Sequence, residues 1–196
     1  MHYVKQAIIP FVYLFFVSII ALGIFMIPEN LQWLRIILLV LNVGLYGLVA
    51  CATAYKDGQD ALKVRIANDL ERMEIIRTGE DRPLKIKQEY APWKGFLTGG
   101  IVCVPLIILL IVHTILVPTT GATGAGAAAG FVYMFIFGFF RVGAGVATPW
   151  MYMYSLFAIP VILLCIGVSY ILGARKIQRQ QDAIKEKQRS IYGDKF

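Results

Sequence analysis

The chain has 196 residues, of which 58% are hydrophobic and only 16% are charged, and its formal net charge is +7. Because charged residues normally make up about a quarter of a soluble domain, this composition excludes an ordinary soluble globular protein. The basic residues gather in two islands, 56–94 and 175–196, and the long apolar stretches outside them predict a helical protein that crosses a membrane several times.

Four apolar stretches are long enough to cross a bilayer, since a helical crossing takes about 20 residues. These stretches are 6–27, 36–55, 96–117 and 152–174. The first is interpreted as an uncleaved span, because it is long for the apolar core of a signal peptide. The predicted fold is therefore an all-α integral membrane protein, a four-transmembrane-helix bundle built from one hairpin in 1–55 and a second in 95–174.

Residues 119–149 separate the last two stretches and are also apolar. Four glycines stand at the start of this segment, where each disfavours a helix by about 1 kcal/mol relative to alanine. A fifth crossing would place the two basic islands on opposite sides and put Arg141 in the bilayer, at a cost of about 2.5–3.5 kcal/mol. We therefore predict an outer re-entrant or interfacial segment, with both termini in the cytoplasm.

The loop 56–94 is expected to contain a cytoplasmic amphipathic helix over about 58–78, with Asp57 as its cap and Gly79 at its end. One face of that helix carries an apolar stripe of Leu62, Ile66, Leu70, Met73 and Ile76. The stripe is expected to dock against the tail or the inner ends of the spans, against a partner subunit, or against the lipid surface.

The tail 175–196 is expected to continue the last span as a helix. Its first basic residues, Arg175, Lys176 and Arg179, are predicted to contact anionic lipid headgroups. The sequence QDALK at 59–63, which follows the second span, returns as QDAIK at 181–185 after the last span. Two tandem hairpins in the same orientation would explain this echo. A chance match of five residues explains it equally, and the sequence leaves both open.

Few residues in the chain are placed for chemistry. Asp57-Gly58-x-x-Ala61 resembles the opening of the CDP-alcohol phosphotransferase signature. The arginine, glycine and two aspartates that this signature requires next are replaced here by Leu62, Glu71, Ile75 and Gly79. No acid lies within a predicted span, and no hydrolase-type set of side chains is visible. We therefore expect a protein that is not an enzyme and uses neither a metal nor a cofactor.

Several residues in the spans are expected to serve the packing of the bundle. The candidate polar contacts are Asn42, His113 and Arg141. Two GxxxG pairs, Gly95 with Gly99 and Gly126 with Gly130, have the spacing that permits close helix packing. The three cysteines, Cys51, Cys103 and Cys165, lack metal or redox spacing and are interpreted as small packing residues.

Two functions fit these features. The first is a self-associating channel or transport component, with a conduction path between subunits because four helices enclose little polar space. The alternative is an accessory or scaffolding membrane subunit that binds a partner through its cytoplasmic helices. The expected partners are the lipid bilayer and either further copies or another membrane protein, not nucleic acid. The expected location is the cell membrane, with the bacterial inner membrane favoured because the chain has no Asn-x-Ser/Thr acceptor.

Overall fold

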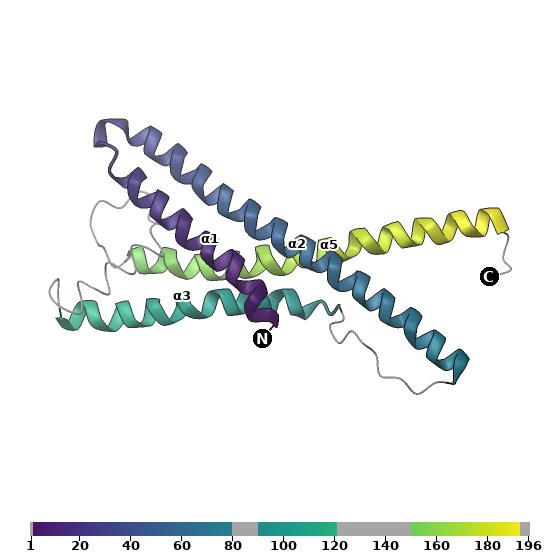
Figure 1. Ribbon diagram of the computed structural model, residues 1–196. Helices are drawn as coiled ribbons and strands as arrows, with labels where there is room; N and C mark the ends of the chain where they lie inside the picture. Colours follow the sequence, from purple (N-terminus) through teal and green to yellow (C-terminus); the bar gives the residue numbers. More distant parts are fainter. Residues whose placement is uncertain (1, 80–89, 121–149, 193–196) are drawn as a thin grey trace.

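The computed structural model describes residues 2–79, 90–120 and 150–192. In these residues the chain is all helical, with four long helices, one short 3-10 turn and no strand (Figure 1). The elements are α1 (His2–Phe25), η1 (Glu29–Leu31), α2 (Gln32–Thr78), α3 (Trp93–Thr120) and α5 (Trp150–Tyr192). Helices α1, α2 and α5 are long and apolar enough to cross a membrane, whereas the described apolar part of α3, Trp93–Ile108, is shorter.

Helix α2 is one uninterrupted helix of 47 residues, about 70 Å long at 1.5 Å per residue. The predicted inner helix is therefore not a separate element, and Asp57 lies in mid-helix and caps nothing. The reason is that 32–78 contains no proline, so no residue in it prevents the helix from continuing. The predicted end is confirmed, because Gly79 adopts a φ of 68° and its N–H bonds the Ile75 carbonyl at 2.9 Å.

Helix α5 runs for 43 residues and contains Pro160, so the basic tail continues the last apolar stretch as a helix to Tyr192. The predicted re-entrant segment lies outside the described residues except at its start. There, Thr119 and Thr120 are the last residues of α3 rather than the beginning of a new element.

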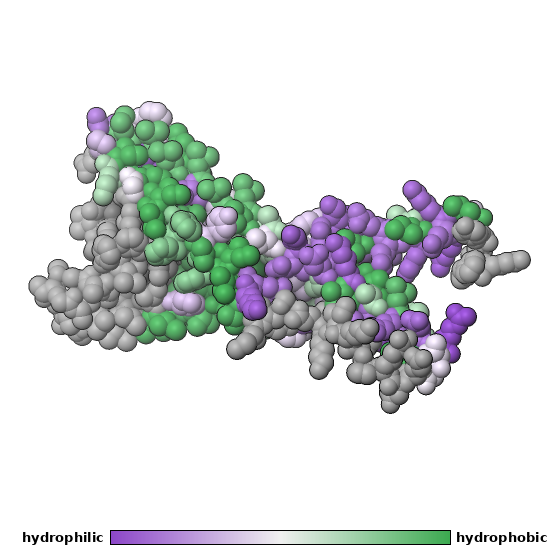
Figure 2. All heavy atoms as spheres, viewed as in Figure 1, coloured by the Kyte–Doolittle hydropathy of each residue, from purple (hydrophilic) through white to green (hydrophobic). Residues whose placement is uncertain are grey.

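The helices pack as two neighbouring pairs, α1 on α2 and α3 on α5, while the most extensive contact joins α2 to α5. Beyond that contact the two helices diverge as free arms that leave the bundle at the same end (Figure 1). We call residues 56–78 the α2 arm and residues 175–192 the α5 arm. Figure 2 shows that the bundle is covered mainly by apolar side chains and the arms mainly by hydrophilic ones.

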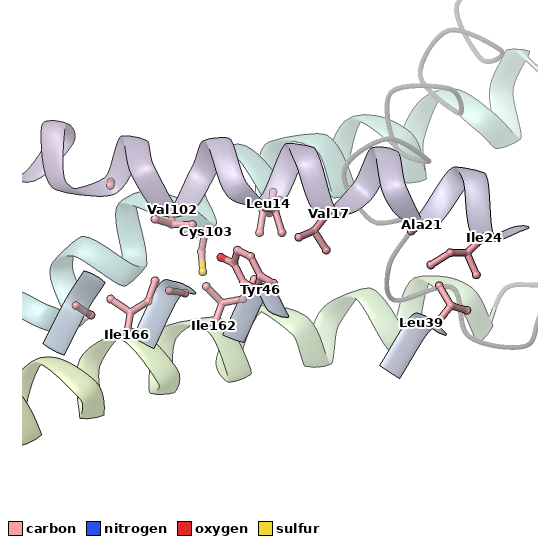
Figure 3. Packing of buried hydrophobic residues seen from close by; sticks show 14 residues of the cluster. Leu14, Val17, Ala21, Ile24, Leu39, Tyr46, Val102, Cys103, Ile162 and Ile166 are labelled. Carbon is pink, nitrogen blue, oxygen red and sulfur yellow. The ribbon is translucent and has the colours of Figure 1, made fainter. Parts of the chain in front are cut away.

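The core lies between the four helices and is built from small and branched apolar side chains. Leu14 and Val17 of α1, Leu39 of α2, Leu106 of α3 and Ile166 of α5 are almost completely buried. Figure 3 shows Tyr46 pointing into this cluster, with its hydroxyl near the sulfur of Cys103. Because this core joins all four helices, it holds the α2–α5 contact in place.

Candidate functional site at the crossing of α2 and α5

Helices α2 and α5 touch backbone to backbone, and two glycines make this possible. A Cβ added to Gly58 would lie 2.8 Å from the carbonyl carbon of Tyr170, and a Cβ added to Gly173 would lie 2.8 Å from the carbonyl carbon of Tyr55. Each helix thus contributes a Tyr-x-x-Gly segment whose glycine faces the tyrosine backbone of the other. Small residues allow such an approach in membrane bundles. We call these four residues the crossing.

Helix α3 packs against the same part of α5 through glycines. A Cβ on Gly95 would lie 2.6 Å from the Tyr170 Cβ, and one on Gly99 would lie 3.3 Å from the Leu163 Cα. This is the close packing expected from the GxxxG spacing of these two residues. The other pair, Gly126 and Gly130, lies outside the described residues.

Aromatic rings and cations surround the crossing. The ring of Tyr90 stacks on that of Tyr170, with centroids 5.5 Å apart and an interplanar angle of 14°. The Lys176 ammonium lies 5.9 Å from the centroid of the Tyr55 ring, within the range of a cation–π contact. Burial raises the pKa of Tyr90, while the nearby Arg175 and Arg65 act in the opposite direction and lower it.

Asp57 is the half-buried carboxyl nearest to the crossing, next to Gly58. Burial is the main cause, and the charge of Asp60 the second, that raise the pKa of Asp57 from 3.8 to about 6 against a smaller lowering effect of Lys56. Among the described residues no ion pair joins Asp57 to the arginines around Tyr90.

At the other end of the bundle, polar groups fasten α1 to α2. The buried Asn42 donates its side-chain amide to the Val17 carbonyl at 2.7 Å. Arg35 donates to the carbonyl of Ile27 across the short link between the two helices. Asn42, proposed above as a polar contact, thus makes an interhelical hydrogen bond.

The structure brings together three cysteines that the sequence analysis treated as separate. Cys51, Cys103 and Cys165 come from α2, α3 and α5, and all three lie near the hydroxyl of Tyr46. The Cys51 thiol lies 3.9 Å from the Cys165 carbonyl oxygen, and the Cys103 thiol 3.6 Å from that of Ile159. Among the described residues no group of three His, Cys, Asp or Glu side chains is placed to hold a metal.

The apolar stripe of the α2 arm is only half covered. Leu62 and Ile66, close to the crossing, are half-buried. Leu70, Met73 and Ile76 are 63%, 66% and 82% exposed. The two arms have diverged at that distance from the crossing (Figure 1), so the described part of the tail does not cover the outer half of the stripe.

The remaining predicted site residues are placed as follows. Arg175, Lys176 and Arg179 are exposed at the start of the α5 arm. His113 belongs to α3, although its side chain is outside the described part, and Arg141 lies outside the described residues altogether. Two residues of this region, Tyr90 and Arg65, were not predicted from the sequence as site residues. The double occurrence of Tyr-x-x-Gly was the available signal for the crossing.

Comparison of this chain with protein-family models, with curated proteins and with solved structures found no match. Its function therefore has to be argued from the geometry above.

Proposed function

We propose that this protein is a non-enzymatic membrane subunit that holds a partner protein at the membrane through its α2 arm. The observation that carries this proposal is the exposure of Leu70, Met73 and Ile76 on a helix that continues directly from the bundle. Full burial of an apolar side chain of this size contributes about 1.5–3 kcal/mol. Three such residues on one helical face provide a substantial driving force for association.

The construction of the arm supports a positioning role. The α2 arm has 23 residues, 56–78, so it extends about 35 Å beyond the apolar stretch. Because the helix has no break and is clamped against α5 at Gly58, its direction is set by the bundle. A partner bound at the outer half of the stripe would be held at a defined distance from the membrane.

The distribution of basic residues indicates on which side of the membrane the two arms lie. Both arms leave the bundle at the same end (Figure 1) and carry most of the basic residues. Because basic residues close to span ends favour the cytoplasm, we infer that this end is cytoplasmic and that the partner is a cytosolic protein or the cytosolic part of a membrane protein.

A channel or transport component has less support from the same geometry. In the described bundle the contacts between helices are made mainly by apolar side chains. The amide group of Asn42, a candidate for lining a path, is already bonded to the backbone of Val17. Self-association through the stripe would favour the channel hypothesis instead, and the test below distinguishes it from partner binding.

The test compares the size of the native assembly in three forms of the full-length chain. Leu70→Glu with Met73→Glu places two charges on the stripe, while Ala67→Glu places one charge on an exposed residue of the same arm away from the stripe. The measurement is the mass of the complex extracted from native membranes, compared with 21.9 kDa for one chain. We expect the wild type and Ala67→Glu to carry a second polypeptide and the stripe variant to lose it.

Two outcomes would contradict the proposal. If the stripe variant keeps the partner, the arm is not the binding surface. If the wild-type complex contains only this chain and the stripe variant disassembles it, the stripe is a self-association surface and the channel hypothesis gains support.

A further inference from the structure

Several cations near the crossing have no carboxylate partner in the described part of the chain. The ion pairs found there join Lys63 to Asp60 at 3.2 Å and Arg72 to Asp69 at 3.3 Å. Asp69 is thus engaged by the arginine that follows it and not by Arg65, which precedes it. Arg65, Arg175 and Lys176 are all exposed, so they are available to an external anion.

These cations converge on the aromatic rings at the point where the arms begin to part. Arg65 follows Gly58 by seven residues, or about two helical turns, and so lies on the face of α2 that points toward α5. Arg65 and Arg175 act on the same tyrosine hydroxyl, that of Tyr90. Tyr90 is fixed in turn by its stack on Tyr170. Two guanidinium groups from different helices thus lie near one phenol, whose ring is stacked on Tyr170.

The cluster also lies where the apolar stretches end, which is where lipid headgroups are expected. Tyr55 is the last residue of the second apolar stretch, and Arg175 and Lys176 directly follow the fourth. Tyrosine and tryptophan are enriched at this boundary, and the exposed Trp93 stands three residues after Tyr90. Figure 2 shows the surface changing from apolar to hydrophilic where the bundle gives way to the arms.

We propose that Arg65, Tyr90, Arg175 and Lys176 form a binding site for the phosphate headgroup of an anionic phospholipid. Arginine matches phosphate through paired N–H donors, lysine supplies a compact charge, and the tyrosine hydroxyl adds a further donor. The lipid is the source of the phosphate because a bilayer presents headgroups at this depth, while the exposed apolar faces of the helices accommodate its chains. This site is independent of the stripe and of any partner bound there.

The test measures the binding of phosphatidylglycerol to the purified, delipidated full-length protein. Phosphatidylcholine with the same acyl chains and inorganic phosphate are the reference ligands. Arg65→Gln with Arg175→Gln removes two charges from the site, and Lys187→Gln with Arg189→Gln removes two exposed charges from the outer part of the α5 arm as a matched control. Because all four residues are exposed, equal melting temperatures without lipid verify that the fold is unchanged.

We expect the site pair to weaken phosphatidylglycerol binding about thirtyfold, because each basic residue near a membrane surface contributes about a factor of five. The single variant Arg65→Gln should weaken it about fivefold, and the control pair less than about threefold. If both pairs weaken phosphatidylglycerol binding equally, the lipid is attracted to the basic α5 arm in general, and the proposal of a specific headgroup site is wrong. A wild type that binds phosphatidylcholine equally well, or inorganic phosphate as tightly as the lipid, would overturn the assignment of its ligand.

Discussion

Replacing Gly58 by alanine is expected to force α2 and α5 apart. The new Cβ would lie 2.8 Å from the carbonyl carbon and 3.1 Å from the Cα of Tyr170. The Tyr170 carbonyl oxygen would lie closer still. Because non-bonded carbon atoms approach only to about 3.5 Å, the helices must separate by more than about 0.7 Å. Overpacking of this kind costs about 1–3 kcal/mol, and the helix propensity of alanine returns about 0.5–1 kcal/mol. The expected net loss in the free energy of unfolding is therefore between about 0 and about 2.5 kcal/mol, with its middle near about 1 kcal/mol.

The thermal unfolding of the protein in detergent measures this loss. The three free cysteines lie in the bundle, where Cys103 is buried and the other two are half-buried, so a thiol-reactive fluorescent dye reports the opening of the core. Gly47→Ala is the matched control, because Gly47 belongs to the same helix and a Cβ there meets no atom within 4 Å. The free energy of unfolding of the Gly47→Ala protein should rise by about 0.5–1 kcal/mol.

Gly173→Ala tests the reciprocal contact, since its Cβ would lie 2.8 Å from the carbonyl carbon of Tyr55. The double variant Gly58→Ala with Gly173→Ala should lose less free energy of unfolding than the two single variants lose together, because the first substitution has already separated the helices. The close approach would be refuted by a Gly58→Ala protein that melts at or above the temperature of the Gly47→Ala protein.

Three further predictions concern other contacts. Asn42→Leu removes the hydrogen bond to the Val17 carbonyl and should lower the stability measured in the same assay by about 0.6–2 kcal/mol; an unchanged midpoint would contradict this. Asp57 has a pKa of about 6 in the fold, raised by burial from 3.8, so the folded state holds its proton more tightly and stability should fall as the pH rises from about 4 to about 6. Asp57→Asn should remove that fall, and above pH 6 its free energy of unfolding should exceed that of the wild type by at most about 1 kcal/mol after allowance for solvent screening. Parallel curves of stability against pH for the two proteins would contradict the raised pKa of Asp57. The Cys51 thiol lies 3.9 Å from the Cys165 carbonyl oxygen, so a short bifunctional thiol reagent should join these two cysteines within one chain. Mass spectrometry detects this link. A link between two chains instead would show that the α2–α5 packing is wrong.

The helical character of the chain was predictable because its signals are local. Apolar stretches of about 20 residues bounded by charges indicate helices that fit a bilayer, and three of the helices have that length and composition. The end of α2 was predictable for the same reason. Gly79 follows the last turn directly, and only the conformation of this one residue is needed to stop the helix.

The continuity of α2 was not predicted, because a capping residue and a mid-helix residue look alike in sequence. Asp57 has a side chain suited to a cap, but a cap forms only where the helix begins. The apolar stretch before it is helical up to that point and contains nothing that ends a helix. A change from apolar to charged composition was mistaken for a boundary between elements, whereas it marks only the change from bundle to arm.

The partners of individual residues could not be derived from the sequence. Gly58 meets Tyr170 across more than a hundred residues, and no local pattern specifies that pairing. The same applies to the cysteines around Tyr46 and to Tyr90, whose importance depends on the stack with Tyr170. The stripe was recognised from its spacing, but its exposure depends on how far the two arms diverge, which is set by the angle at the crossing.

That crossing also bears on the echo between QDALK and QDAIK. QDALK begins one residue after Gly58, whereas QDAIK begins eight residues after Gly173. If the two halves are aligned by matching QDALK with QDAIK, their Tyr-x-x-Gly segments are therefore out of register by seven residues. Seven residues are two helical turns less about 20°, so both echoes lie on nearly the same helix face relative to their glycines, but farther out in α5. A duplication that produced both features requires a seven-residue insertion in the α5 arm or a deletion of the same length in the α2 arm. The reciprocal packing of two glycines on two tyrosine backbones explains the pairing of α2 with α5 without any common origin.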